Sequence, residues 1–359
     1  MARVRVAACG VLFWDEGTLV WDDYLHQRQL ALTENSEAVL RWFAQWRELD
    51  TAEQSGPRHR AIADRLLQTG VLIQENSAEH VAEHRLLTEW RAWGPATRYH
   101  HFAGRTVADT RYLEVWEDEA HFAEKAKQEP PPPAAKSYPG QPLILLPKGR
   151  PDDAGWPRRD LLDVLYARRS TRQFTDDPVS LAALGAVVQV GGGAVEEMDH
   201  PDIGKVLFKT SPSAGARTPL ELYVYANRVQ GLAPGLYHFA PLSGGLENLC
   251  RTASAQELLD AVGGQRWLAD CAFLLIYTAV PARTRWRYQS RRAYRDILIE
   301  LGHASQTVLL TATAMGLGAV TATAVRDELL ERLLGCDPVT EPILAVTAVA
   351  VPRDPAANR

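Results

Sequence analysis

The pattern of apolar and polar positions predicts a large core in the second half of the chain. Four apolar-rich segments read as strands: LELYVYANRV (220–229), GLYHFAP (235–241), DCAFLLIYTAV (270–280) and PILAVTAVAVP (342–352). The run at 270–280 is almost continuously apolar, which is typical of a central strand covered on both faces.

Helical spacing appears between these strands. Residues 159–170 predict a helix whose inward face is Leu161, Leu162, Leu165 and Tyr166. An apolar helix follows, with Ser180 as its cap and glycines 191–193 as its stop. A long helix is expected from about Ala293 to Met315, ended by Gly316. Strands and helices together predict an α+β fold.

The first eighty residues follow a different pattern. Strands flank a turn at Asp15-Glu16-Gly17, and a helix with Ser36 as its cap carries Val39, Leu40, Phe43 and Trp46. A second helix ends at Gly70 and a short strand follows. This order outlines a winged-helix-like module. Its second helix carries Arg58, Arg60 and Arg65, but the module is also rich in acids, so peptide binding or structural docking is favoured over DNA binding.

Residues 81–157 read as a linker with some helix, ending in the proline-rich QEPPPPAAKSYPGQP at 128–142. Consecutive prolines exclude a helix interior and favour extended backbone, so this stretch predicts a boundary or a surface strap. His80 and His84 lie one helical turn apart, but no third ligand is evident and a solvated helix is favoured over a metal site. The predicted domains are therefore 1–80, 81–157 and 158–359.

Composition narrows the function. The chain has 359 residues, 46% of them hydrophobic and 23% charged, and a net charge of −5. This balance is typical of a soluble globular protein and argues against nucleic acid as the main partner. Four scattered cysteines, of which Cys9 and Cys271 are expected to be buried thiols, favour a reducing cytoplasm. Neither a signal peptide nor a membrane span is indicated.

The segment YARRSTRQF (166–174) places Arg168, Arg169, Ser170 and Arg172 within five positions. Guanidinium and hydroxyl groups at this density suit a phosphate, yet the arginines could equally complement a helix C-terminus. GLGAVT (316–321) resembles a dinucleotide fingerprint but lacks the third glycine and follows a helix, which makes a Rossmann domain unlikely.

Taken together, RRSTRQF, SPSAGARTP and YRDILIELGHASQTVLLTATAMGLGA resemble the flavin-dependent nitroreductase superfamily over roughly 158–353. Within it they look most like the SagB-type branch, which includes azoline dehydrogenases of peptide natural products. The resemblance implies a central mixed sheet flanked by helices, an FMN cofactor and a homodimer with FMN at its interface. The front module is similar in outline to winged-helix domains that bind leader peptides.

The resemblance also implies cofactor-binding residues. Arg168, Ser170 and Arg172, with Arg169 beside them, fall where the superfamily holds the FMN phosphate and ribityl chain, and Arg353 matches a further phosphate-side arginine. The isoalloxazine ring is expected to meet a loop across the dimer interface and the backbone N–H groups of a turn. The matching residues are Pro212, Ser213, Ala214 and Gly215 for the loop, Leu317 and Gly318 for the turn, and Gln306 on the long helix.

The catalytic residues depart from the branch. A Lys-Tyr pair is its acid–base element; here Tyr288 matches the tyrosine, but Arg287 stands at the lysine position. Arginine stays protonated and cannot act as an ordinary base, so Tyr288, Tyr294 or His303 would handle the proton. His303 is also compatible with a core histidine, the favoured interpretation. The dense arginines at 283–295 are compatible with a solvated face or with a docking strip for an acidic or C-terminal carboxylate of a peptide substrate.

The resulting prediction is an FMN-dependent oxidoreductase in the biosynthesis of ribosomally made peptide products, with azoline-to-azole oxidation as the leading reaction. Oxidation of another side chain on a peptide or carrier-bound substrate is an alternative. An NAD(P)H-dependent nitro or quinone reductase is a third possibility. A scaffold that binds a leader peptide without strong catalysis is the alternative from another class.

Overall fold

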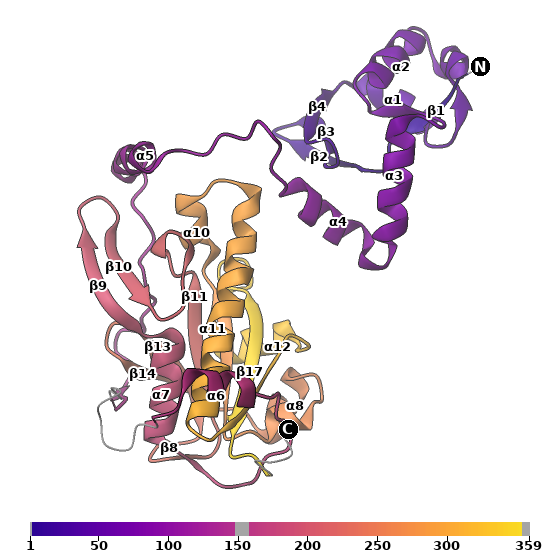
Figure 1. Cartoon of the computed structure of the whole chain (residues 1–359). Helices are drawn as coiled ribbons and strands as arrows, with labels where there is room; N and C mark the ends of the chain where they lie inside the picture. The colour runs from indigo at the N-terminus through magenta and orange to yellow at the C-terminus, as the bar shows by residue number, and fades with distance from the viewer. Residues whose placement is uncertain (1, 148–157, 354–359) are drawn as a thin grey trace. The chain divides into compact units, whose positions relative to one another are not determined.

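The computed structural model describes residues 2–147 and 158–353, and the chain divides into two compact units, Met1–Thr110 and Arg111–Arg359 (Figure 1). The first unit extends beyond the boundary predicted at residue 80. The reason is Glu83, whose buried carboxylate accepts hydrogen bonds from the Ala8 backbone and the Arg5 side chain. The predicted middle region is thus divided between the two units.

The first unit contains two small antiparallel sheets with helices packed around them. One sheet has the order β5-β1-β6, and the other has the order β2-β3-β4. The elements are β1 (Arg3–Val6), β2 (Gly10–Asp15), β3 (Thr18–Asp23), β4 (Arg28–Leu32), α1 (Glu34–Trp42), β5 (Arg47–Glu48), a 3-10 helix (Leu49–Ser55), α2 (His59–Gln68), β6 (Leu72–Gln74), α3 (Ala78–Glu89), a 3-10 helix (Arg91–Trp93) and α4 (Gly94–Ala103).

The β2–β3 hairpin turns at Glu16 and Gly17, as the sequence predicted, and both residues have positive φ. The predicted cap of α1 was wrong. Thr33 occupies the N-cap position, and Ser36 lies inside the first turn, where its hydroxyl hydrogen-bonds to that of Thr33 at 3.0 Å.

The second unit is built on a seven-stranded sheet of order β16-β17-β15-β11-β13-β14-β7. Its elements are α5 (Val115–Gln128), β7 (Leu143–Leu145), α6 (Leu161–Ala167), β8 (Val179–Ser180), α7 (Leu181–Gly192), β9 (Ala194–His200), β10 (Gly204–Lys209), a 3-10 helix (Ala214–Ala216), β11 (Leu220–Ala226), β12 (Val229–Gln230), β13 (Gly235–Ala240), β14 (Gly245–Arg251), α8 (Ala255–Ala261), α9 (Arg266–Ala269), β15 (Phe273–Ala279), α10 (Pro281–Arg287), a 3-10 helix (Arg291–Ala293), α11 (Tyr294–Ala314), β16 (Gly318–Ala322), α12 (Asp327–Leu334) and β17 (Ile343–Ala350).

The α+β class is confirmed, with one difference in strand direction. The pairings within the seven-stranded sheet are antiparallel, whereas the sequence analysis expected a mixed sheet. Parallel pairing occurs outside that ladder, between β8 and β12 and at the bridge from Ser170 to Ala319. A short loop joins β13 to β14, whereas α12 lies between β16 and β17 and the connection from β15 to β17 includes α10 and α11.

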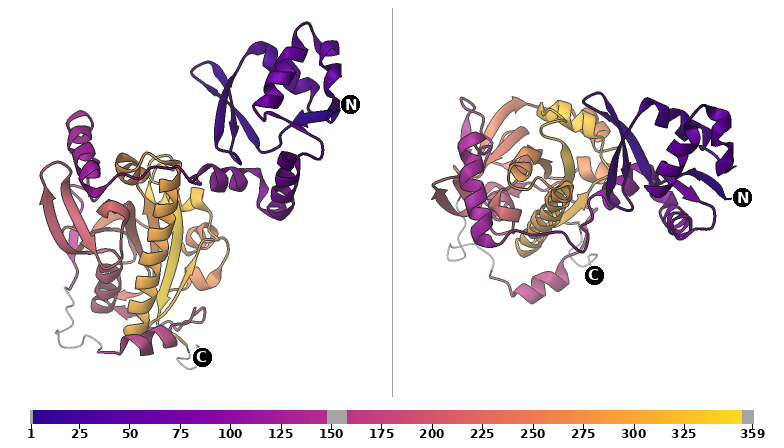
Figure 2. Two further views of the ribbon diagram at one scale, coloured as in Figure 1. Left: turned by 45° about the horizontal axis from the view of Figure 1, so that its top comes forward. Right: turned by 90° about the horizontal axis from the view of Figure 1, so that it is seen from above.

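Helices α7 and α11 pack together along the sheet (Figure 1 and Figure 2). Their close approach depends on Gly191, because a Cβ atom there would lie 2.4 Å from Cγ2 of Val308. Ser180 caps α7 as predicted, accepting a hydrogen bond from the Ala183 N–H at 3.1 Å. In the described ranges, no helix combines the length and apolar character that crossing a membrane requires.

The apolar face of helix α6 is exposed, whereas the sequence pattern predicted that it would face inward. Leu161, Leu162, Leu165 and Tyr166 are 65%, 61%, 41% and 79% exposed. Val164 is the buried residue of the helix. Apolar spacing identifies the face that avoids water but not the surface that covers it, and within one chain this face stays open.

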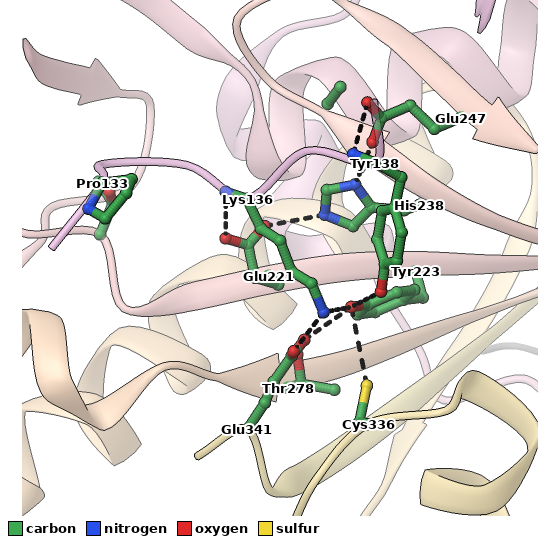
Figure 3. Close-up of polar contacts among 12 residues, drawn as sticks. Pro133, Lys136, Tyr138, Glu221, Tyr223, His238, Glu247, Thr278, Cys336 and Glu341 are labelled. Atoms are coloured by element: carbon green, nitrogen blue, oxygen red, sulfur yellow. Dashed lines mark hydrogen bonds and ion pairs between the residues drawn. The ribbon is translucent and has the colours of Figure 1, made fainter. Parts of the chain in front are cut away.

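The proline-rich segment runs as a strap across the sheet (Figure 3). The Lys136 N–H donates to Glu221 at 2.9 Å and the Tyr138 N–H to Glu247 at 3.0 Å. Arg283 donates to the Pro133 carbonyl at 2.7 Å. Because prolines lack a backbone donor, the strap is held through its carbonyls and through the residues that follow.

Candidate active site

The arginine-rich segment after α6 lies beside the ends of β16 and β17. The Thr171 N–H donates to the Ala319 carbonyl at 3.1 Å, and the Arg353 N–H to the Gln173 carbonyl at 3.0 Å. The fit is tight at Gly318, where a Cβ atom would lie 2.7 Å from Cγ2 of Thr171. The structure therefore brings together 168–172 and Arg353, predicted separately as the phosphate side, and places beside them Gly318, which was predicted at the ring.

The side chains of this segment differ in what they contact. Arg169 donates to the carbonyls of Tyr166 (2.7 Å) and Arg168 (2.8 Å), so it caps the end of α6. The Arg172 guanidinium carbon lies 5.4 Å from the centroid of the Trp267 ring, which is a cation–π contact. Within residues 2–147 and 158–353, no acceptor side chain pairs with Arg168, Ser170 or Arg172. These three side chains are the donors available to an anion.

The predicted turn donor at Leu317 is already used. Its N–H donates to the Ala312 carbonyl at 2.8 Å, closing the C-terminal turn of α11. The Leu317 N–H is therefore not free to face a flavin, and a flavin contact at Gly318 stays a prediction.

The loop predicted to approach the ring packs against the end of α10. Gly215 has φ +57, and a Cβ atom there would lie 2.3 Å from Cδ of Arg287 and 2.7 Å from the Tyr288 hydroxyl. Ala216 and Thr218 also have positive φ, which is strained for a β-branched residue. Strain of this kind concentrates at functional sites, so this loop is held in an unusual shape beside Arg287 and Tyr288.

His303 is exposed and lies at the same loop. Its Nδ1 is 3.4 Å from the Pro212 carbonyl oxygen. The favoured interpretation as a core histidine was therefore wrong. Gln306 is likewise exposed nearly one turn further along α11, and Tyr294 is 40% exposed at the start of the helix.

Helix α5 contributes to this part of the molecule, which the sequence did not indicate. Asp118 pairs with Arg287 at 2.7 Å, and the Arg287 guanidinium lies 4.1 Å from the centroid of the Phe122 ring. Arg283, expected in an exposed docking strip, is instead buried and paired with Glu221.

A cavity behind the loop collects further groups that the sequence analysis missed. Lys209, Ser211, Glu221 and Glu300 line it, together with apolar residues of α7, α11 and the sheet. Burial raises the pKa of the Glu300 carboxyl, and a hydrogen bond with Ser213 partly offsets this. Burial lowers the pKa of Lys209. The sequence did offer one signal. Lys209 lies just before SPSAGARTP, and Glu300 lies just before His303.

A buried network supports the loop and the strap (Figure 3). His238 lies between Glu221 (3.0 Å) and Glu247 (2.7 Å) and is fully buried. Burial alone would raise the pKa of Glu221, but hydrogen bonding by His238 and the Arg283 charge outweigh it and hold the pKa at about 2. Arg283 also donates to the Thr218 carbonyl at 2.9 Å, which links the network to the strained loop.

The two clusters lie at different positions along α11. His303 and the loop 212–215 are near its middle, whereas Gly318 and the arginine segment follow its C-terminal end. At about 1.5 Å per residue, His303 lies roughly 16 Å from the last residue of the helix. Within one chain, the arginine segment and the loop 212–215 are therefore separate.

Comparisons with known proteins identify the second unit. The model of the Nitroreductase family matches residues 165–350. "Putative nitroreductase MJ1384" of Methanocaldococcus jannaschii is 34% identical over 174 residues, which is 48% of this chain and 83% of that protein. The trifolitoxin-processing protein TfxB of Rhizobium leguminosarum bv. trifolii is 27% identical over 175 residues, covering 48% of this chain and 47% of that protein.

A solved structure from Anabaena variabilis, also described as a putative nitroreductase, shares the fold. Its TM-score is 0.54 at 22% identity, covering 72% of this chain and 48% of that one. This chain thus matches about half the length of TfxB and of the Anabaena protein. The resemblance drawn from the sequence is confirmed: the chain belongs to the nitroreductase family.

Proposed function

We propose that this protein is an FMN-dependent oxidoreductase that dehydrogenates a peptide or peptide-derived substrate, with azoline-to-azole oxidation as the leading reaction. The observation that carries the proposal is the set of unpaired donors Arg168, Ser170 and Arg172 beside the close-packed backbone of Gly318. Family membership supports the redox chemistry. The name of the relative TfxB, a trifolitoxin-processing protein, supports a peptide substrate.

The residues present fit FMN. Arg168 and Arg172 would bind the phosphate with planar paired donors, and Ser170 would add a hydroxyl. Because Gly318 carries no Cβ, Thr171 packs directly against its backbone, which holds the arginine segment at this edge of the sheet. When bound, FMN supplies a hydride acceptor. Arg353 lies at the same edge and adds positive charge.

A homodimer would bring the two clusters together. Exposed apolar residues on α6 and α11 include Leu161, Leu162, Leu298 and Ile299. An apolar surface of this extent is typical of a subunit interface. In a two-fold dimer, the phosphate side of one protomer can face the loop 212–215 of its partner. We include this arrangement in the proposal.

Tyr288 is the proposed proton acceptor. Its hydroxyl lies beside Gly215 in the loop assigned to the ring, and His303 lies at Pro212 of the same loop. Arg287 remains protonated and is paired with Asp118, so it orients neighbouring groups and holds negative charge. Within this proposal, Tyr288 takes the substrate proton as its phenolate, after its own proton has left to solvent, and His303 is placed to assist that transfer.

The first unit offers a place for a leader peptide. A groove of about 600 Å³ lies between β1, β2 and α1, lined by residues that include Val6, Leu12 and Leu40. Arg5, Glu37 and Arg41 lie among the lining residues and add charge. An extended peptide can pair with an exposed strand edge and place side chains in such a groove.

The test is conversion of a synthetic peptide carrying one thiazoline, followed by mass spectrometry. The purified yellow protein is expected to remove two hydrogen atoms from the peptide. Tyr288→Phe should retain bound flavin but react about a hundred-fold more slowly, because a general base contributes at least about this factor.

Other outcomes would overturn the proposal. A yellow protein that leaves the peptide unchanged but turns over NADPH with a quinone would identify a reductase. A protein that takes up no FMN would leave the scaffold alternative. Wild-type rates for Tyr288→Phe would remove the role assigned to this hydroxyl.

A further inference from the structure

Arg217, which follows the loop 212–215, is a buried arginine without a hydrogen-bond acceptor. It is 2% exposed, and its Nε is buried without a partner. Across the described parts of the chain, no carboxylate or carbonyl accepts from its guanidinium. The Trp286 ring lies 5.2 Å from the guanidinium carbon, which gives a cation–π contact but no lone pair. An unsatisfied buried charge destabilises a fold, so this side chain calls for a functional explanation.

The surroundings of Arg217 carry an excess of positive charge. Burial lowers the pKa of Arg217 most, and the charges of Arg287 and Arg283 lower it further. The acidic partner of Arg283 is Glu221, whose carboxylate also hydrogen-bonds to His238. Arg287 has Asp118 as its acidic partner, and its own Nε is also buried without an acceptor. The contacts around Arg217 and Arg287 therefore supply one carboxylate for two guanidinium groups.

That carboxylate comes from α5, which contacts Arg287 directly and, through Phe122, the Trp286 ring that lies against Arg217. Phe122 of α5 stacks on Trp286 with ring centroids 5.9 Å apart. The Arg287 guanidinium carbon lies 4.1 Å from the centroid of the same Phe122 ring. Asp118 is 29% exposed, so its ion pair with Arg287 is partly hydrated. Partly hydrated ion pairs contribute little to stability, and a competing carboxylate can therefore replace Asp118.

We propose that Arg217 and Arg287 form a carboxylate-binding site for an acidic side chain of the peptide substrate, occupied by Asp118 of α5 until the peptide arrives. Two guanidinium groups match the two oxygens of one carboxylate. The site adjoins Gly215 and Tyr288, so a bound carboxylate would fix the peptide beside the proposed proton acceptor. That the ligand is a peptide rests on the proposed function. The excess of guanidinium groups is observed independently of that function.

The test uses fluorescein-labelled tri-glutamate and tri-glutamine peptides with amidated C-termini, so that only the side chains differ in charge, with binding measured by fluorescence anisotropy on the full chain. Asp118→Asn should strengthen tri-glutamate binding about ten-fold and leave tri-glutamine binding unchanged. Glu124→Gln, an exposed acid on the same helix, is the matched control and should have no effect. Adding Arg217→Met or Arg287→Gln to Asp118→Asn should cancel the gain.

A second readout separates binding from a structural role. Arg217→Met keeps the aliphatic part of the side chain and removes an unpaired buried charge, so the Tm of the ligand-free protein should rise by roughly 2–4 °C. A fall in Tm, equal binding of the two peptides, or equal effects of Asp118→Asn and Glu124→Gln would overturn the site. Flavin absorbance is recorded for every variant. If Arg217→Met loses FMN, the guanidinium serves the flavin and the inference fails; if wild type binds FMN but does not distinguish the peptides, the inference fails while the proposed function stands.

Discussion

Replacing Arg168 and Arg172 together with glutamine is expected to give a colourless protein whose FMN affinity is about a thousand-fold lower. Each charge-assisted hydrogen bond to phosphate contributes about 1.5–3 kcal/mol, and about 1.4 kcal/mol is a ten-fold change in affinity. Neither side chain has an acidic partner in the described structure, so the fold should not depend on them. Flavin absorbance after purification and fluorescence titration with FMN measure the effect.

The control for this pair is Arg332→Gln. Arg332 is an exposed arginine of α12 that pairs with Glu328, and its loss should leave FMN affinity unchanged. Thermal unfolding of the double variant should match that of wild type without FMN. A double variant that stays yellow, or a similar loss with Arg332→Gln, would show that the arginine segment does not hold the cofactor.

Glu221→Gln is expected to lower the free energy of unfolding by about 3–5 kcal/mol, because it leaves Arg283 and His238 buried without their shared carboxylate. The carboxylate is 2% exposed and also accepts from the Lys136 N–H of the strap. Urea unfolding measures the change. Glu124→Gln, which is exposed, should leave the free energy of unfolding almost unchanged. A similarly small shift for Glu221→Gln would contradict the role of the network.

Glu221 is also expected to make the free energy of unfolding depend on pH. Glu221 has a pKa of about 2 in the folded protein against an ordinary 4.5. A depressed pKa contributes stability above the unfolded value, and this contribution is lost as pH falls from about 4.5 towards 2. Glu221→Gln should lack this part of the acid unfolding profile. Parallel profiles for the two proteins would show that another group is responsible.

Much of the second unit could be predicted from the sequence, because continuous apolar runs identify covered strands. The runs at 220–229, 270–280 and 342–352 became β11, β15 and β17. The hairpin β9–β10 was not predicted, because β9 is acidic and largely exposed and gives no apolar pattern. Helix α6 was predicted with the wrong face inward, because periodicity does not show which surface covers an apolar stripe.

The candidate site was less accessible to sequence reasoning. Spacing cannot separate Arg168 from Arg169, since the end of α6 decides which guanidinium turns back to the helix carbonyls. Asp118 and Arg287 pair although they are 169 positions apart. Arg217 reads as an ordinary loop residue, and its lack of an acceptor is visible only once the fold is known.

The most direct test of phosphate binding by the arginine segment is to titrate the protein with FMN and with riboflavin, which lacks the phosphate. Wild type should bind FMN at least about a hundred-fold more tightly than riboflavin, and the Arg168→Gln/Arg172→Gln variant should bind the two about equally. Equal affinities in wild type, or a preference for FMN that persists in the variant, would contradict the central claim.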